Sequence, residues 1–393
     1  MISFLLGAGF SQADGVPLIS DIRDQLSELT VDDIYIHSDL KLIVLNGQDK
    51  PTPLLHEIEE NFIISFINFY SDNYELNYEY LFDYINEYLR NGGHQGEIED
   101  FYDRFVESQD VDQNRIPTCN NILESFKKYF QQLISSFLTV GEYFKDVGLG
   151  NYPPYDPFFN FIKQLINEKN EDVCVNTLNH DLLFEHVASK LSGLWENFDD
   201  GYRELGSPYY GEVNIEEGVR KSYKIRVKYF VNKFEKPLTF YKLHGSIDTY
   251  DFDIRIPDSD RVKTDYRVGS IFREVFNKEQ NSFKYVRSFR NHYPDFLTGT
   301  TGKTIGYRDE YYSILIDHFK NNLQNSDLLI VIGYSFCDGG INDLLWKNYL
   351  SKDKQVVIID IEEPDFPFED EFDSNCIIKE FKDVTLEEYL DLI

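Results

Sequence analysis

Five short apolar runs, each followed at once by small or polar residues, constrain the fold of this 393-residue chain more than any other feature. The runs are residues 2–6, 173–178, 238–243, 327–332 and 355–360. Such runs are typical of parallel strands that are covered on both faces. Helical patterns lie between most of them, over residues 19–28, 156–168, 181–191, 308–323 and 340–350. This alternation predicts an α/β fold, with a Rossmann-like parallel sheet flanked by helices.

A different pattern occupies residues 36–150. Apolar side chains recur there at spacings of three and four, as between Phe126 and Phe137, which is typical of amphipathic helices. We therefore expect a helical insertion over residues 36–150. Residues 1–35 and 151–393 would then form one Rossmann-type catalytic domain.

Two stretches, at about 200–236 and about 250–306, show no clear pattern of either kind. We expect both stretches to be irregular and to cover the functional site of the protein. The acidic segment 362–373 is expected to be a solvated loop.

Charge and cysteine usage narrow the class of protein. The chain has 38 Lys and Arg against 69 Asp and Glu, a net charge of −31. Direct binding to nucleic acid or to an anionic membrane needs a cationic face, so we expect neither. No apolar run reaches the roughly 18 residues of a membrane span. The scattered cysteines lack the C-x-x-C spacing of structural zinc sites, and no signal peptide precedes the first strand, which favours a cytoplasmic protein without a metal.

Unusual polar clusters follow the apolar runs, where ligands bind in open α/β sheets. The clusters are Gly7-Ala8-Gly9-Phe10-Ser11, Thr177-Leu178-Asn179-His180-Asp181, His244-Gly245-Ser246, Gly333-Tyr334-Ser335 and the single carboxylate Asp360. Because parallel strands end at the same edge of a sheet, we expect these clusters to converge.

Three of the clusters have a plainer explanation beside the functional one. The glycines after the first run suit a phosphate-binding loop, but position 12 is Gln rather than the last Gly of G-x-G-x-x-G, and a tight turn needs glycine as well. Asn179 or Asp181 alone could cap the next helix. His244 is a candidate general base, although a lone histidine is usually structural.

Taken together, the clusters resemble the sirtuin-like superfamily. The order G-A-G-x-S, T-x-N-x-D, H-G, G-x-S and a final acidic residue matches that family, and Lys242-Leu-His-Gly-Ser246 is similar to a hallmark of its bacterial antiphage-defence branch. The resemblance implies that Asn179 binds the nicotinamide ribose and positions water, and that His244 is the general base. It further implies that Asp181 holds the carboxamide, that Asp360 binds the adenine ribose, and that NAD+ contacts come from Gly7, Ala8, Gly9, Ser11, Thr177, Gly333 and Ser335.

The resemblance implies an NAD+ glycohydrolase that consumes NAD+ as a substrate, needs no metal and defends the cell against phage by depleting NAD+. It also implies a homo-oligomer or a separate partner, such as a HerA-type ATPase or a short Argonaute. The four-Cys zinc module of protein deacylases is missing. An ADP-ribosyltransferase, a deacylase and a catalytically silent nucleotide-binding scaffold stay as alternatives.

Overall fold

A computed structural model describes residues 1–37, 40–45, 47–51, 56–139, 153–217, 219–252, 260–264, 270–286, 293–298, 309–352, 354–368 and 374–393. The chain forms two compact units. The first unit comprises Met1–Gly15, Gly141–Phe296 and Tyr307–Ile393, and the second comprises Val16–Val140 and Leu297–Gly306. Helix α2 (Ile19–Glu28), which we expected in the catalytic domain, contacts α3 and α4 of the second unit.

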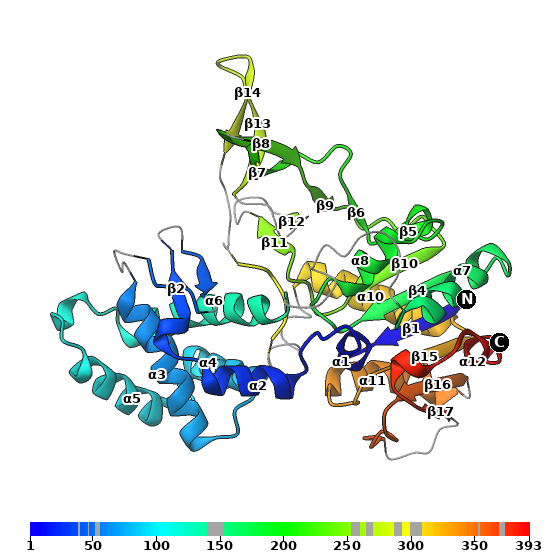
Figure 1. Cartoon of the computed structure of the whole chain (residues 1–393), viewed down its shortest axis with the longest axis horizontal. Helices are drawn as coiled ribbons and strands as arrows, with labels where there is room; N and C mark the ends of the chain where they lie inside the picture. Colours follow the sequence, from blue (N-terminus) through cyan, green and yellow to red (C-terminus); the bar gives the residue numbers. More distant parts are fainter. Residues whose placement is uncertain are drawn as a thin grey trace. The chain divides into compact units, whose positions relative to one another are not determined.

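The first unit is built on a parallel sheet whose described part has seven strands (Figure 1). In spatial order these are β17 (Ser374–Ile378), β16 (Gln355–Asp360), β15 (Leu328–Ile332), β1 (Ile2–Leu6), β4 (Val173–Thr177), β10 (Leu238–Lys242) and β5 (Phe198–Asp199). The five apolar runs are five of these strands, so the predicted Rossmann-like sheet is confirmed. Without the two-residue edge strand β5, the chain order across the sheet is 6-5-4-1-2-3, which is the order of doubly wound dinucleotide-binding sheets.

The register of the sheet brings the strand ends level. Ile2 lies opposite Leu328 and Val173, and Val173 lies opposite Leu238. The strands β15, β1, β4 and β10 therefore end together at their carboxyl edge. In a doubly wound sheet the chain turns in opposite directions on the two sides of β1, so a crevice is expected between β1 and β15 at this edge.

Helices cover both faces of this sheet. Phe4 of β1 packs edge-on against Phe158 of α7 (Asp156–Asn167), with ring centroids 5.4 Å apart. On the opposite face, Asn322 of α10 (Glu310–Asn325) reaches Asn176 of β4. The remaining α-helices in the described part of the unit are α1 (Ala8–Gln12), α8 (Leu183–Lys190), α11 (Gly339–Asn348) and α12 (Leu386–Leu390).

In the described parts of residues 200–236 and 250–306, two antiparallel sheets are present where we expected irregular structure, so that expectation was wrong there. One sheet has the order β11-β12-β9-β6 and the other β14-β13-β7-β8. Their strands are β6 (Tyr202–Arg203), β7 (Tyr209–Glu217), β8 (Val219–Arg226), β9 (Lys228–Phe230), β11 (Thr249–Phe252), β12 (Asp260–Lys263), β13 (Ile271–Asn277) and β14 (Ser282–Val286). Short strands with one solvent-exposed face contain both charged and aromatic residues. The alternation of apolar and polar side chains that marks a strand is therefore hard to recognise in their sequence.

The second unit is helical, as predicted for the insertion. Besides α2 it contains α3 (Glu57–Asn73), α4 (Tyr78–Asn91), α5 (Gln95–Ser108), α6 (Cys119–Phe137) and the strand pair β2 (Ile34–Ile36) and β3 (Leu42–Val44). Its core is aromatic: Phe66 packs edge-on against Phe101 and Phe126. Buried Glu60 accepts hydrogen bonds from the Ile36 N–H (2.7 Å) and the Lys50 ammonium (2.8 Å), which compensates the cost of burying its charge.

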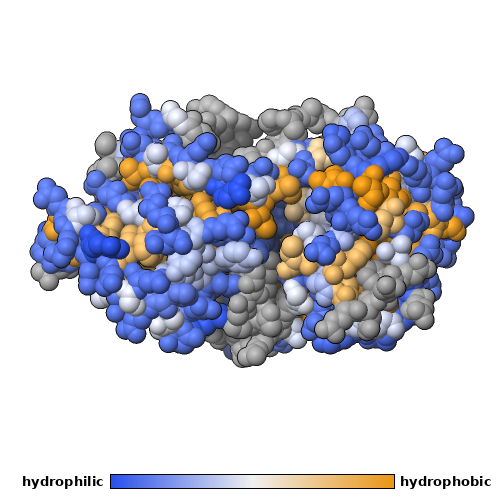
Figure 2. All heavy atoms as spheres, turned by 90° about the horizontal axis from the view of Figure 1, so that it is seen from below, coloured by the Kyte–Doolittle hydropathy of each residue, from blue (hydrophilic) through white to orange (hydrophobic). Residues whose placement is uncertain are grey.

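The surface agrees with the composition. The face drawn in Figure 2 is mostly hydrophilic, with hydrophobic residues gathered in patches between polar ones. Within the described residues, no helix has both the length and the apolar character needed to cross a membrane.

Candidate functional site

The loops that follow four neighbouring strands are joined at the carboxyl edge of the parallel sheet. The Gly7 N–H donates to Ile332 O (2.9 Å), and the Leu178 N–H donates to Leu6 O (3.0 Å). The Leu243 N–H donates to Thr177 O (3.0 Å). These bonds extend the sheet ladder by one residue beyond β1, β4 and β10. They hold the predicted clusters side by side, as the common strand direction led us to expect.

The two glycine loops touch backbone to backbone. A Cβ atom on Gly7 would lie 2.4 Å from Gly333 O, and one on Gly9 would lie 2.8 Å from Gly333 Cα. Gly333 itself has φ +59°, where a side chain is strained. Contact between the β1 and β15 loops therefore explains these glycines without a ligand. Ala8 and Ser335, which belong to the same two loops, are exposed.

Asn179 is held in one orientation. Its side-chain Nδ2 donates to Gly7 O (2.8 Å) and to Ser11 Oγ (3.0 Å). Because a main-chain carbonyl can only accept, the amide cannot be flipped. Both N–H donors are thus used, and among the described residues nothing donates to Oδ1. The half-buried side chain presents an acceptor, which is what a water molecule or a ribose hydroxyl requires.

Ser11 links Asn179 to Asp181. Ser11 is buried. Its hydroxyl oxygen accepts a hydrogen bond from the side-chain amide of Asn179, and the hydroxyl group also hydrogen-bonds the Asp181 carboxyl group. Burial raises the pKa of Asp181, against the opposing effects of Lys242 and of hydrogen bonds from the Leu183 N–H and Ser11. Asp181 also accepts the Leu183 N–H (3.0 Å) at the start of α8, so the helix-end explanation holds for this residue alongside its place in the site.

His244 is almost fully buried, with 2% of its surface exposed. Its Nε2 atom lies 3.4 Å from Oδ2 of Asp338, a residue at the start of α11. The next residue, Gly245, has φ +83°, and a Cβ there would lie 2.6 Å from Asp295 O. Asp338 stands three residues after the Gly333–Ser335 cluster in the sequence, but no sequence pattern indicated a contact with His244.

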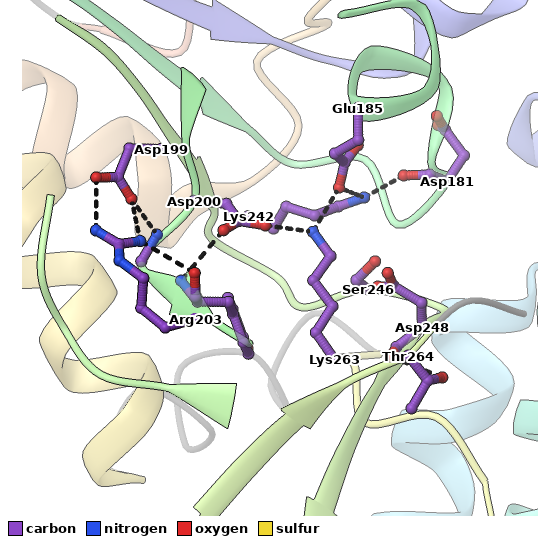
Figure 3. A network of polar contacts seen from close by, with 12 residues as sticks. Asp181, Glu185, Asp199, Asp200, Arg203, Lys242, Ser246, Asp248, Lys263 and Thr264 are labelled. Carbon is purple, nitrogen blue, oxygen red and sulfur yellow. Dashed lines mark hydrogen bonds and ion pairs between the residues drawn. The ribbon is translucent and has the colours of Figure 1, made fainter. Parts of the chain in front are cut away.

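A buried ionic network contacts the loop that follows β4 (Figure 3). Lys242, the last residue of β10, donates to the main-chain oxygen of Asp181 and lies 3.3 Å from Glu185 Oε1. Lys263 of β12 lies 3.1 Å from the same Glu185 oxygen and 3.0 Å from Asp200 Oδ2. Burial alone would raise the pKa of Glu185, but the two lysines outweigh it and hold the pKa below its usual range.

Lys242, in the K-L-H-G-S motif, and Asp181 were singled out from the sequence, but no sequence pattern predicted that Glu185 and Lys263 join them. Lysines are almost never fully buried unless they are paired, so Lys263 would be placed on the surface by its residue type. Its partners Glu185 and Asp200 lie on other elements, far away in the sequence.

Asp360 ends β16 at the same edge of the sheet. The Gly333 N–H donates to Ile359 O (3.0 Å), which places Asp360 beside the β15 loop. The strands β15 and β1 lie between it and the Asn179 loop. Its Oδ1 atom accepts the Ile361 N–H (2.7 Å), and burial raises its pKa.

A cavity of about 300 Å³ lies elsewhere in the first unit. Trp195, Phe198, Tyr202, Arg203 and Lys228 are among its lining residues. Strand β5 pairs there with the first residues of β10, whereas the candidate residues follow the last. The candidate residues therefore do not line this cavity, and we place the candidate site at the carboxyl edge of the sheet. Within the described residues, no three His, Cys, Asp or Glu side chains are grouped to hold a metal.

No protein-family model matches this chain, and no curated protein matches it either. The sirtuin-like resemblance thus rests on the motifs alone and stays a prediction.

Proposed function

We propose that this protein is an NAD+ glycohydrolase, which cleaves NAD+ with water into nicotinamide and ADP-ribose. The observation that carries the proposal is the oriented amide of Asn179, held by Gly7 O at the carboxyl edge of a sheet with dinucleotide-binding strand order. The motif order that resembles sirtuin-like enzymes adds to this support.

The dinucleotide would bind across the crevice between the β1 and β15 loops. Gly7, Gly9 and Gly333 keep this region free of side chains, and Ala8 and Ser335 are exposed beside it. Asp360, next to the β15 loop, is suited to accept hydrogen bonds from ribose hydroxyls. The nicotinamide half would then extend over β1 toward the loop after β4.

The reaction suits the residues at that loop. The C1′–N1 bond breaks and its electron pair neutralises the cationic nicotinamide ring, so no strong acid is needed. The ribose passes through an oxocarbenium-like state that water must attack from the opposite face. Asn179 Oδ1 would accept a hydrogen bond from that water, and His244 would take its proton as the new C1′–O bond forms. Fixed placement of the reactants would supply most of the acceleration.

The biological role that we propose follows from the resemblance to the antiphage-defence branch. Depletion of NAD+ would halt the infected cell. Assembly into a homo-oligomer, or a separate partner such as a HerA-type ATPase or a short Argonaute, would control the activity. Uncontrolled turnover would harm the host, so low activity of the isolated chain is compatible with the proposal.

The test is a comparison of acceptors. Purified protein in its active assembly is incubated with NAD+ alone, with NAD+ and an acetyl-lysine peptide, and with NAD+ and a protein acceptor, and the products are separated by chromatography. We expect equal amounts of nicotinamide and ADP-ribose in all three samples. Turnover that requires the peptide, or ADP-ribose that appears only on protein, would replace the hydrolase with one of the transferase alternatives.

A further inference from the structure

His244 and Asp338 form a contact that links the two halves of the doubly wound sheet. His244 follows β10 and Asp338 follows β15. In the sheet, β1 and β4 lie between these strands. The 3.4 Å contact between His244 Nε2 and Asp338 Oδ2 therefore spans the ends of β1 and β4, the strands that carry Gly7 and Asn179.

Asp338 is placed firmly enough to orient another side chain. Its Oδ1 atom accepts the Ile341 N–H (3.0 Å) as the cap of α11, which leaves Oδ2 on the side of His244. The loop that carries it is tied together: the Tyr334 hydroxyl bonds Asn342 Oδ1 (2.8 Å), and Asn342 Nδ2 donates to Phe336 O (2.6 Å). Each carboxylate oxygen thus has a separate partner.

We propose that Asp338 is a positioning residue for the general base. The carboxylate beside Nε2 would determine which ring nitrogen carries the proton in neutral His244, and would stabilise the imidazolium after the ring takes the proton of water. This inference rests on the proposed function. The 3.4 Å separation is an ion-pair distance, longer than the 2.7–2.9 Å of a typical charge-assisted hydrogen bond, and contacts of this kind tighten when substrate binds.

Because Asp338 is not proposed to touch the substrate, its replacement should change kcat rather than KM. Asp338→Asn removes the charge but keeps the helix cap, because Asn and Asp cap helices about equally well. We expect kcat to fall about 10- to 1000-fold with KM nearly unchanged. The acid limb of the pH–rate profile should move to lower pH, because the imidazolium loses its partner. Asp338→Ser keeps a cap but cannot reach His244, and should behave like Asp338→Asn.

The matched control is Asp343→Asn on the same helix, where an exposed carboxylate pairs with Lys347 at 2.9 Å. This variant should retain the kinetics and the pH profile of the wild type. His180, whose ring centroid lies 6.2 Å from that of His244, is the same in every variant.

A second measurement separates this inference from the proposed function. The titration midpoint of the His244 imidazole, followed by NMR of protein with labelled histidine, should be lower in Asp338→Asn than in the wild type. If the wild type in its active assembly releases no nicotinamide but the midpoint shifts, the proposed function fails and the pairing stands. A midpoint and a kcat that both match the wild type in Asp338→Asn would overturn the role of Asp338.

Discussion

The side-chain amide of Asn179 donates a hydrogen bond to the main-chain oxygen of Gly7, with 2.8 Å between the two atoms. This bond joins the loops that follow two adjacent strands, β4 and β1. It also directs the acceptor oxygen of Asn179 away from Gly7. One contact thus accounts both for the order of the loop and for the atom that the proposed mechanism uses.

Asn179→Ala is expected to lower NAD+ turnover by about 10²–10⁴-fold, because the attacking water loses its acceptor. Asn179→Asp should be similarly impaired, since a carboxylate has no N–H to donate to Gly7 O. Steady-state kinetics of both variants test this, with circular dichroism as the check on folding. Near-normal turnover by a folded Asn179→Ala would remove Asn179 from the mechanism.

Gly333→Ala is expected to destabilise the first unit by about 2–5 kcal/mol, from the positive φ and from overlap with the Gly9 backbone. The new Cβ would lie 2.5 Å from Gly9 Cα. Gly339→Ala is the control, because a Cβ there meets nothing within 4 Å, and its effect should stay within about 1 kcal/mol. Urea denaturation of the two variants measures the difference. Equal stability would contradict the close packing of the β1 and β15 loops.

Much of the fold followed from local sequence signals. The five apolar runs became parallel strands because a strand buried on both faces must be apolar along its whole length. The edge strand β17 was missed, since Ser374–Ile378 is only partly buried and contains polar residues. The strands of the antiparallel sheets were missed for a related reason, because one wet face lets charged residues enter each strand.

The candidate site followed from the sequence only in part. Asn179 and His244 were identified because each stands at the end of an apolar run, where residue type and position coincide. The partners of His244 and Lys242 were not identified. Asp338 contacts His244, and Glu185 contacts Lys242, only because folding brings distant parts of the chain together. Contacts between distant segments leave no trace in local periodicity.

The stability of the chain should depend on Asp199 at low pH. Burial acts to raise the pKa of this carboxyl group, but hydrogen bonds from Arg203 and from the N–H groups of Glu235 and Gly201 outweigh it and hold the pKa below the ordinary value of 3.8. An acid with a lowered pKa in the folded state stabilises the protein above the unfolded value, and this contribution is lost as pH falls through the folded value.

Asp199→Asn should therefore cost about 1–3 kcal/mol near neutral pH, where the ion pair with Arg203 is lost. The gap to the wild type should narrow as pH falls below 3.8. Urea unfolding between neutral and acidic pH measures this gap. The exposed pair of Asp343 with Lys347 supplies the control, since Asp343→Asn should change little at any pH. A gap that stays constant with pH would show that the charge of Asp199 is not involved.

Chelation is expected to leave the proposed activity unchanged. The nicotinamide ring of NAD+ is already cationic and leaves the ribose as a neutral molecule, so no Lewis acid is needed to expel it, and the cysteines lack zinc-site spacing. The rate of nicotinamide release is compared before and after dialysis against EDTA, with any partner ATPase absent because it would require magnesium. Turnover that is lost on chelation and restored by zinc would contradict this expectation.

The most direct test of the central claim is product stoichiometry. Wild-type protein, Asn179→Ala and His244→Ala are assembled in the same way, incubated with NAD+ and sampled over time by chromatography. The account predicts that the wild type yields one nicotinamide and one ADP-ribose for each NAD+ consumed, while both variants leave NAD+ intact and stay folded. Intact NAD+ with wild-type protein in its active assembly, or full turnover by either variant, would contradict it.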